Sequence, residues 1–321
     1  MHCLITGGAG YVGTKLAECL LNNGYDVTIM DLCWFGSYFP SRNILNLIQK
    51  DVREITADDL VDVDVVFHLA GVANDPSSIL NPALCWDIAL TSIYRLAEAA
   101  VKMNEPPRIV FASSGSVYGV QTVDRITEEL ELRPLSTYNK SKIGAERTLI
   151  SYADKLQIQI VRPATVCGVS PRMRLDLAVN LLTAAAVRDG VITVLGGSQY
   201  RPNIHIDDLV DVYVHLLLNP SFTGIFNAGF ENIKISDIAE MVSNKTGAKI
   251  KFEPSNDPRS YRIDSTKLLE TGYQPSKSVA HAITEVITAI EEQQFSSGEF
   301  NSNVNWMRYL IGEGKISELT L

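Results

Sequence analysis

Tyr138 and Lys142 stand four residues apart in a segment that has the pattern of a helix start. Pro134 precedes the segment and Ser136 is placed to cap its first turn, so both side chains project from one helical face. A phenol has a pKa of about 10, but a neighbouring ammonium or another positive charge would favour the phenolate. This pair could therefore exchange a proton with a hydroxyl group of a ligand.

A second stretch rich in hydroxyl groups, ASSGSVYG (112–119), follows the apolar run RIVF. A strand that ends in such small residues predicts a loop at which a ligand is bound. The serines are suited to hydrogen-bond a substrate oxygen that gains or loses a proton. The spacing Tyr-x-x-x-Lys is common on helix surfaces, so its meaning depends on this loop and on a nucleotide site elsewhere.

The N-terminal sequence LITGGAGYVGTKL predicts a strand, a glycine-rich turn and the start of a helix. Gly8, Gly10 and Gly13 fit the pattern G-x-G-x-x-G, and Gly7 gives a second, overlapping glycine pattern. Gly10 would let the backbone approach a pyrophosphate, and Gly13 would let the helix pack closely on the strand. The free N–H groups of the helix N-terminus would then bind the phosphates.

Asp31 ends the second predicted strand, in the position from which a carboxylate accepts hydrogen bonds from both hydroxyls of a ribose. A carboxylate at this place repels a 2′-phosphate. We therefore predict that the cofactor is NAD rather than NADP.

Short apolar runs alternate with longer amphipathic ones over the first two-thirds of the chain. Strands are predicted at 2–6, 26–31, 63–70, 108–113, 157–163, 191–195, 203–206 and 224–229, and helices at 13–22, 84–104, 136–155 and 207–218. This alternation predicts an α/β fold with a Rossmann-type doubly wound parallel sheet and a smaller mixed α/β domain. The predicted NAD-binding domain covers 1–170 and about 203–230; the predicted substrate-binding domain covers about 171–202 and 231–321.

The bulk composition narrows the range of partners. A net charge of −9 argues against nucleic acid as a partner, and no apolar run approaches the roughly 18 residues that span a membrane. The N-terminus lacks the pattern of a signal peptide. Five scattered cysteines without a CxxC pair indicate reduced thiols and no metal site. We therefore expect a cytoplasmic protein.

Several motifs occur in a characteristic order: TGGAGYVG, HLAG (68–71), SSGSVYG, YNKSK, RPNIHIDDL and PRSYRID (258–264). Together they resemble the extended short-chain dehydrogenase/reductase family, in particular its NAD-dependent nucleotide-sugar epimerases and dehydratases. The resemblance covers nearly the whole chain and implies an NAD-dependent enzyme that acts on a nucleoside-diphosphate sugar. It also implies a homodimer, because the helices at 84–104 and 136–155 correspond to a pair that often forms the dimer interface.

The resemblance assigns roles to individual residues. Tyr138 corresponds to the general acid/base, Lys142 to the residue that binds the nicotinamide ribose, and Ser114 to the hydroxyl partner of the reacting sugar oxygen. The implied cofactor-binding residues are Gly7, Gly10, Tyr11, Val12, Gly13, Asp31, Asp51, Val52, Leu69, Ala70, Ser113, Tyr138 and Lys142. The implied substrate-binding residues are Ser114, Ser116, Asn180, Arg201, Arg259 and Arg262.

Two guanidinium groups that converge on a diphosphate would grip its paired oxygens. The alternative is that each arginine makes only a surface ion pair with Asp207, Asp257 or Asp264. Arg172 and Arg174 add positive charge near the expected sugar or phosphate site.

An absence distinguishes between the reactions of the resembled family. Its sugar 4,6-dehydratases and glucuronate decarboxylases carry a glutamate immediately before the V/L-Y-G motif, whereas Gly115 and Ser116 stand here. Neither residue can serve as a carboxylate acid or base. We therefore predict a nucleotide-sugar epimerase, acting at C4 through a transient 4-keto sugar. The alternatives are a nucleotide-4-keto-sugar reductase, a dehydratase with a differently placed acid, and an NAD(H)-sensing binding protein.

Three further reactive side chains are predicted to pack rather than to react. Cys167 has no adjacent histidine to activate its thiol. His68 lies within an apolar strand, and His205 lies at the end of another.

Overall fold

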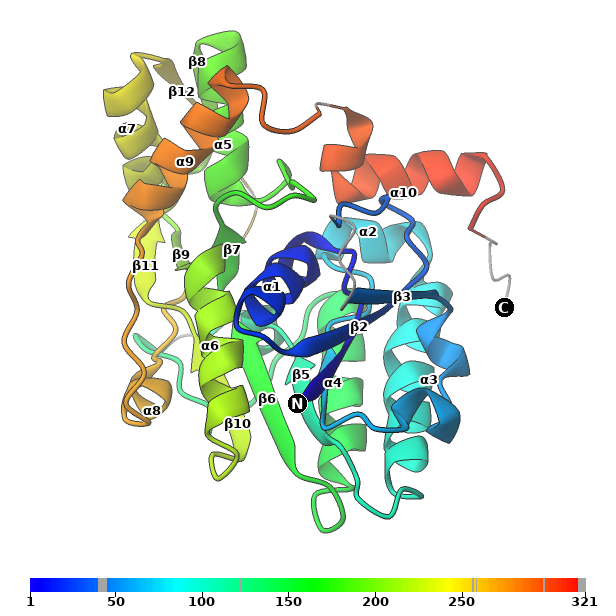
Figure 1. The fold of residues 1–321 in the computed structure, drawn as a ribbon. Coiled ribbons are helices and arrows are strands. Elements are labelled where there is room, and N and C mark those ends of the chain that lie inside the picture. Colours follow the sequence, from blue (N-terminus) through cyan, green and yellow to red (C-terminus); the bar gives the residue numbers. More distant parts are fainter. Residues whose placement is uncertain (40–44, 122, 256, 258, 297, 317–321) are drawn as a thin grey trace.

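The computed structural model describes residues 1–39, 45–121, 123–255, 257, 259–296 and 298–316 (Figure 1). Seven parallel strands form its central sheet, in the order β10-β6-β5-β4-β1-β2-β3. Their bounds are His2–Thr6 (β1), Asp26–Asp31 (β2), Leu45–Gln49 (β3), Val65–His68 (β4), Arg108–Ala112 (β5), Ile158–Pro163 (β6) and Gly224–Ala228 (β10). The strand order reverses between β1 and β4, which opens a crevice at the carboxyl ends of these strands. The predicted doubly wound fold is confirmed.

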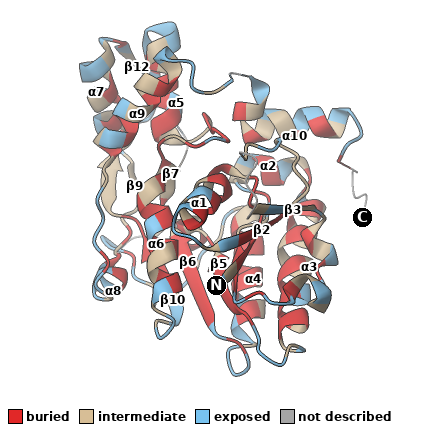
Figure 2. Cartoon of the chain, in the orientation of Figure 1, coloured by how far each residue is buried: buried red, intermediate tan, exposed pale blue. Residues whose placement is uncertain are grey.

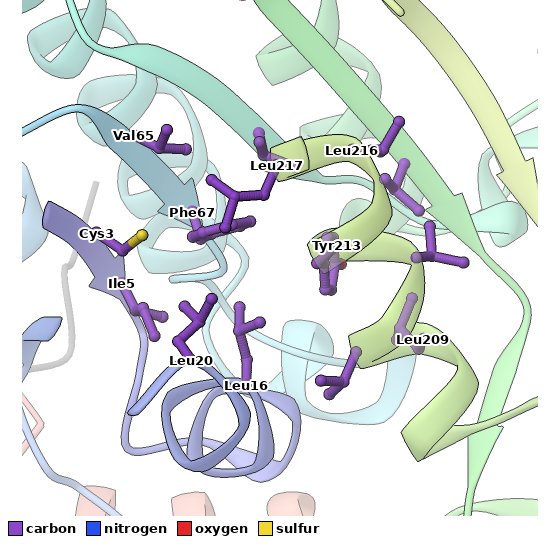
Figure 3. Close-up of a cluster of buried hydrophobic side chains, with 14 of the residues drawn as sticks. Cys3, Ile5, Leu16, Leu20, Val65, Phe67, Leu209, Tyr213, Leu216 and Leu217 are labelled. Atoms are coloured by element: carbon purple, nitrogen blue, oxygen red, sulfur yellow. The ribbon is translucent and has the colours of Figure 1, made fainter. Parts of the chain in front are cut away.

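Helices cover both faces of this sheet (Figure 1). α1 (Tyr11–Asn22) and α6 (Ile206–Leu218) lie on one face, and α3 (Pro82–Ala100) and α4 (Thr137–Ile150) lie on the other. Figure 3 shows the first interface, where Leu16 of α1 and Tyr213 of α6 meet Ile5 and Phe67 of the sheet. The rings of Phe67 and Tyr213 lie 6.0 Å apart. Buried residues follow the strands and the inner faces of the helices (Figure 2).

Side-chain caps set the starts of the two helices on the second face. Asn81 accepts a hydrogen bond from the Leu84 N–H at 2.9 Å, and proline at position 82 fits the first turn of α3. Ser136 caps α4 by accepting from the Asn139 N–H at 3.1 Å, and the Asn139 side chain accepts from the Ser136 N–H in return. The predicted helix starts therefore lie within two residues of the observed ones.

A smaller second half carries two further sheets. One has the order β11-β9-β7 and the other pairs β12 with β8. The elements are β7 (Thr165–Cys167), β8 (Val191–Leu195), β9 (Tyr200–His205), β11 (Glu231–Lys234), β12 (Lys249–Glu253), α5 (Ala178–Asp189), α7 (Ile235–Thr246) and α9 (Val279–Glu291). The three helices and strand β8 enclose a separate apolar core. The remaining elements are α2 (Asp75–Leu80), α8 (Thr266–Leu269), α10 (Asn303–Gly312) and the 3-10 turns η1 (Val52–Glu54), η2 (Ala57–Leu60), η3 (Gly115–Tyr118) and η4 (Glu299–Asn301).

The structure differs from the predicted domain boundaries in two places. The run 203–206 was assigned to the NAD-binding domain, but β9 pairs antiparallel with β11 and parallel with β7 in the smaller sheet. The C-terminal part of 231–321 was assigned to the substrate-binding domain, but α10 lies beside α2 on the NAD-binding half (Figure 1). Met307 and Leu310 pack there with Val52 and Leu84, because the short helix α2 leaves apolar surface for α10 to cover.

None of the helices in the described ranges has the length and the apolar character that a membrane crossing requires.

A buried ion pair ties α4 to the sheet. The Arg162 guanidinium of β6 donates to both carboxylate oxygens of Glu146, at 2.9 and 2.6 Å, and both side chains are almost fully buried. Arg162 also donates to the Tyr118 hydroxyl at 2.8 Å, and the Ser113 hydroxyl donates to Glu146. These bonds join the helix that carries Tyr138 to the loop that follows β5.

We predict that Arg162→Met destabilises the protein by about 3–5 kcal/mol, because it leaves the Glu146 carboxylate buried without a partner. Urea denaturation of the two proteins measures the difference in unfolding free energy. The double variant Arg162→Met with Glu146→Leu removes both charges and should recover part of the loss. Equal destabilisation by the single and double variants would contradict this account.

Candidate active site

A cavity of about 530 Å³ opens at the carboxyl ends of the central strands. It runs from the glycine turn, past the loops after β4 and β5, to side chains of the smaller half. Among the residues singled out from the sequence, its lining includes Gly7, Gly10, Tyr11, Val12, Gly13, Asp31, Asp51, Val52, Leu69, Ala70, Ser113, Ser114, Ser116, Tyr138, Lys142, Arg201 and Arg259. Residues that lie far apart in the sequence are thus brought to one continuous surface.

The glycine turn is held by close backbone packing. Gly7 has φ of +72°, and a Cβ atom there would lie 2.6 Å from the Ala70 backbone nitrogen. A Cβ atom on Gly13 would lie 2.6 Å from the Gly7 carbonyl oxygen. No side chain caps α1 at Gly10, so the first N–H groups of this helix remain available to phosphate oxygens.

Asp31 is fixed at the end of β2 beside this turn. Its carboxylate accepts hydrogen bonds from the Ala9 N–H at 3.0 Å and the Cys33 N–H at 2.8 Å. Burial raises the pKa of Asp31, and the two backbone bonds oppose that rise. Each carboxylate oxygen keeps lone pairs for the hydroxyl groups of a ribose. The turn, Asp31 and the cavity between them therefore fit a dinucleotide.

A chain of hydrogen bonds leads away from Tyr138. Its hydroxyl bonds to the Ser114 side chain, and the Ser114 and Ser116 hydroxyls lie 2.8 Å apart. The Asn139 amide donates to the Ser116 hydroxyl at 2.8 Å and to the Asp75 carboxylate at 3.2 Å. The serine loop and two consecutive residues of α4 thus form one network that ends at a carboxylate.

The electrostatics of Tyr138 and Lys142 differ from the expectation. Burial raises the pKa of Tyr138 to about 12; the bond to Ser114 opposes this rise and Asp75 adds to it. Burial lowers the pKa of Lys142 to about 8, and its ammonium donates to the Ala112 carbonyl at 2.7 Å. The expected lowering of the Tyr138 pKa therefore depends on the positive charge of the nicotinamide, which the chain alone does not supply.

Arg201 and Arg259 lie at the other end of the cavity and share one carboxylate. Asp257 accepts from Arg201 at 2.8 Å and from Arg259 at 2.7 Å, and Asp75 accepts from Arg259 at 2.9 Å. Each arginine thus forms an ion pair and also lines the cavity, and the predicted contact with a diphosphate stays a prediction.

Two predicted substrate contacts lie outside the cavity lining. The Asn180 side chain is fully buried, accepts from the Gly168 N–H at 3.0 Å and donates to the Tyr11 hydroxyl at 3.1 Å. Its amide joins the two halves through these hydrogen bonds, and the substrate contact implied by the resemblance stays a prediction. Arg262 stacks on Tyr200, with its guanidinium carbon 3.8 Å from the ring centre, and pairs with Asp124. It does not line the cavity, and its predicted contact with the substrate stays a prediction.

Sequence reasoning missed several residues of the cavity lining. Asp75 follows the HLAG motif at the first turn of a short helix, and a carboxylate at that place was a usable signal. Arg172 and Arg174 stood out as positive charges, but their direction depends on the folding of the loop before α5. Asn303 comes from the C-terminal segment, where the sequence carried no functional signal.

His68, His205 and Cys167 have structural roles. His68 is buried between the Thr6 hydroxyl at 2.9 Å and the Ser92 hydroxyl at 3.2 Å, and burial lowers its pKa to about 3. Cys167 is buried in the core of the smaller half, which raises the pKa of its thiol. His205 caps α6 by accepting from the Asp207 N–H.

His205, Asp207 and Glu285 gather their potential ligand atoms within 4.8 Å of one another. Lys15 pairs with Asp207 at 3.0 Å, and Lys277 pairs with Glu285 at 3.2 Å. Protein cations thus already balance both carboxylates of this cluster.

The sheet, the glycine turn and the Tyr138–Lys142 pair together define a dinucleotide-dependent enzyme of the short-chain dehydrogenase/reductase type. A family model described as the NAD dependent epimerase/dehydratase family matches residues 3–229, and the chain belongs to this family. Its cofactor is therefore NAD.

Individual relatives share the fold along most of their length. The UDP-glucose 4-epimerase of Lactobacillus helveticus is 27% identical over 300 residues, which cover 83% of this chain and 89% of the relative. A solved structure of an NAD-dependent NDP-hexosamine 5,6-dehydratase, TunA, matches with a TM-score of 0.82 and 26% identity, over 91% of this chain and 98% of that one. The UDP-glucuronic acid 4-epimerase of Bacillus cereus, solved with UDP-glucuronic acid and NAD, matches with a TM-score of 0.80 and 26% identity, over 91% and 100%.

We predict that Lys142→Met increases stability at neutral pH by up to about 3 kcal/mol, because it removes a buried ammonium. The native pKa of about 8 lies below the unfolded value of 10.5, so the unfolded chain binds the extra proton between these two values. Wild-type stability relative to the variant should therefore rise with pH across this window.

Urea denaturation of both proteins at neutral pH and at pH about 10 tests this prediction. The difference in unfolding free energy between the variant and wild type should be smaller at the higher pH. Lys140→Met, at an exposed lysine of the same helix, is the matched control and should show no such gap. A gap that stays constant with pH would rule out this explanation.

Proposed function

We propose that this protein is a nucleotide-sugar epimerase that inverts C4 through a transient 4-keto sugar. The observation that carries the proposal is the network at Tyr138, in which Ser114 bonds the Tyr138 hydroxyl and Ser116 presents a hydroxyl group where a dehydratase of the resembled kind carries an acid. An inversion that removes and returns one hydride needs no second acid at that position. Relatives named as 4-epimerases of UDP-glucose and UDP-glucuronic acid add support.

In the proposed reaction, Ser114 hydrogen-bonds the sugar O4 and Tyr138, as its phenolate, removes the O4 proton. NAD, when bound, would supply the redox chemistry as the acceptor and donor of the C4 hydride. Lys142 binds the nicotinamide ribose, and its ammonium favours the phenolate once it turns toward Tyr138. The 4-keto sugar then presents its opposite face, and Tyr138 gives the proton back to O4. Atoms balance, because product and substrate are isomers.

Arg201 and Arg259 are the groups that we propose for the diphosphate of the substrate. Their guanidinium groups line the end of the cavity away from the glycine turn and share Asp257. A diphosphate offers paired oxygens that suit two such forks.

Asp75 favours dehydration as a second candidate function. Its carboxylate lines the cavity and bonds the same Asn139 amide that donates to Ser116. The Asp75 carboxylate is therefore linked by two hydrogen bonds, through the Asn139 amide, to Ser116, where the chain lacks the acid of the resembled dehydratases. The structural similarity to TunA, named as a 5,6-dehydratase, is in line with this candidate.

We further propose a cytoplasmic homodimer that uses α3 and α4 as its interface. Tyr94 and Ile150 on these helices are 52% and 45% exposed, as an interface between copies would require. The free cysteines among the described residues fit a reducing compartment. Light scattering coupled to gel filtration tests the dimer, and Tyr94→Glu should shift it toward the monomer.

We predict that Tyr138→Phe lowers kcat by several orders of magnitude, because the proton acceptor for O4 is lost. The change removes one hydroxyl, so the variant should retain bound NAD and a near-normal unfolding transition. The replacement of Tyr261, which also lines the cavity, by phenylalanine is the matched control. Near-normal turnover of the Tyr138→Phe protein would refute the assigned base.

The reaction itself is tested by turnover of UDP-, GDP-, CDP- and dTDP-sugars in deuterated water without added cofactor, followed by mass spectrometry and NMR. Epimerisation at C4 yields an isomer of unchanged mass with no deuterium on carbon. Loss of water with deuterium on carbon would favour dehydration, and Asp75→Asn should then abolish it. Turnover of a keto sugar only with added NADH would identify a reductase.

A further inference from the structure

Six basic side chains line the described part of the cavity, and most are already neutralised by the chain itself. Lys50 pairs with Asp59, Arg174 with Asp176, and Arg201 and Arg259 with Asp257. Lys142 donates to a backbone carbonyl beside the proposed base. Arg172 differs from all the paired cations, since no carboxylate of the described residues lies within ion-pair distance of its guanidinium.

Arg172 is 3% exposed, which makes an unpaired charge costly. One of its terminal nitrogens donates to the Asn303 side-chain oxygen at 2.6 Å and to the Phe300 carbonyl at 3.4 Å. Its guanidinium carbon lies 3.9 Å from the centre of the Phe35 ring. In the part of the chain that the structure describes, its other two nitrogens have no acceptor. A buried guanidinium with free donors facing a cavity is suited to an anion.

The position of Arg172 identifies the anion. Phe35 follows the strand that ends in Asp31, so Arg172 lies at the adenosine end of the cavity rather than at the end that holds Tyr138. Asp31 and Arg172 affect each other electrostatically but do not form an ion pair. A bound nucleotide would lie between them, with its ribose at Asp31 and its phosphates toward Arg172.

We propose that Arg172 binds the pyrophosphate of NAD. The smaller half of the molecule thereby completes a phosphate site that the N-terminus of α1 begins, and the cofactor is clamped between the two halves. This inference concerns NAD and is independent of which sugar reaction the enzyme performs.

Asn303 is a positioning residue for this clamp. Its side chain holds the Arg172 guanidinium, and its backbone N–H donates to the Asp176 carboxylate at 2.9 Å. The Trp306 indole N–H donates to the Trp34 carbonyl at 2.6 Å. The C-terminal segment thus joins the loop after β2 to the loop before α5, and both loops border the adenosine end.

The test compares Arg172→Gln with wild type in binding NAD, ADP-ribose and adenosine, each measured by equilibrium dialysis with labelled NAD as the displaced ligand. The variant should bind NAD and ADP-ribose about 10- to 100-fold more weakly, as expected for loss of a charged hydrogen bond. Its affinity for adenosine, which has no phosphate, should stay unchanged. Arg308→Gln, at an exposed arginine of α10, is the matched control.

An equal loss for adenosine and ADP-ribose would overturn the proposal in favour of a structural role. Unchanged binding of all three ligands would also overturn it.

A second variant keeps the test independent of folding defects. Asn303→Asp gives Arg172 a carboxylate partner, which should neutralise the guanidinium and repel the pyrophosphate. It should weaken ADP-ribose binding more than Asn303→Ala does, with adenosine again unaffected. Wild-type affinity of the Asn303→Asp protein for ADP-ribose would contradict the clamp, whatever the outcome of the sugar assays.

Discussion

The ion pair between Arg162 and Glu146 fixes the catalytic helix to the central sheet, and the geometry of the site depends on it. Glu146 lies on α4 one turn beyond Lys142, and it also accepts the hydroxyl of Ser113. The register of α4 against the loop after β5 is therefore set by charged hydrogen bonds in a buried environment, where they are strong and directional. Apolar packing alone would allow α4 to slide, and the bond between Tyr138 and the serine loop would then be lost.

The two ends of the cavity hold their cations in different ways. At the end proposed for the sugar nucleotide, Arg201 and Arg259 are held by ion pairs with Asp257 and Asp75. At the adenosine end, Arg172 has no such competitor among the described residues. Among the described residues, the two ends therefore differ in how far the chain itself neutralises their cations.

Local sequence patterns predicted the parts of the molecule that are themselves local. The glycine turn and the position of Asp31 could be predicted from the sequence, because the backbone conformation that they need depends on neighbours in the chain. Tyr138 and Lys142 could be predicted as a pair because residues four apart lie on one face of a helix. The rise of the Tyr138 pKa could not be predicted, since it is caused by burial, which depends on the whole fold. The internal hydrogen bonds of Asn180 were not predicted for a similar reason: an amide in an apolar helix fits a ligand contact or an internal hydrogen bond equally well before packing is known.

The C-terminal segment has a consequence for how the protein matures. The parallel sheet and the glycine turn lie early in the chain, and the dinucleotide crevice can form once β6 and β10 have joined the sheet. Asn303 and the helix that it begins come much later; Asn303 holds the Arg172 guanidinium, and the segment connects the two loops at the adenosine end. Because chains emerge from the ribosome N-terminus first, a nascent chain would have the crevice before it has the means to retain a dinucleotide. Firm retention of NAD would then mark a molecule whose last helix has docked.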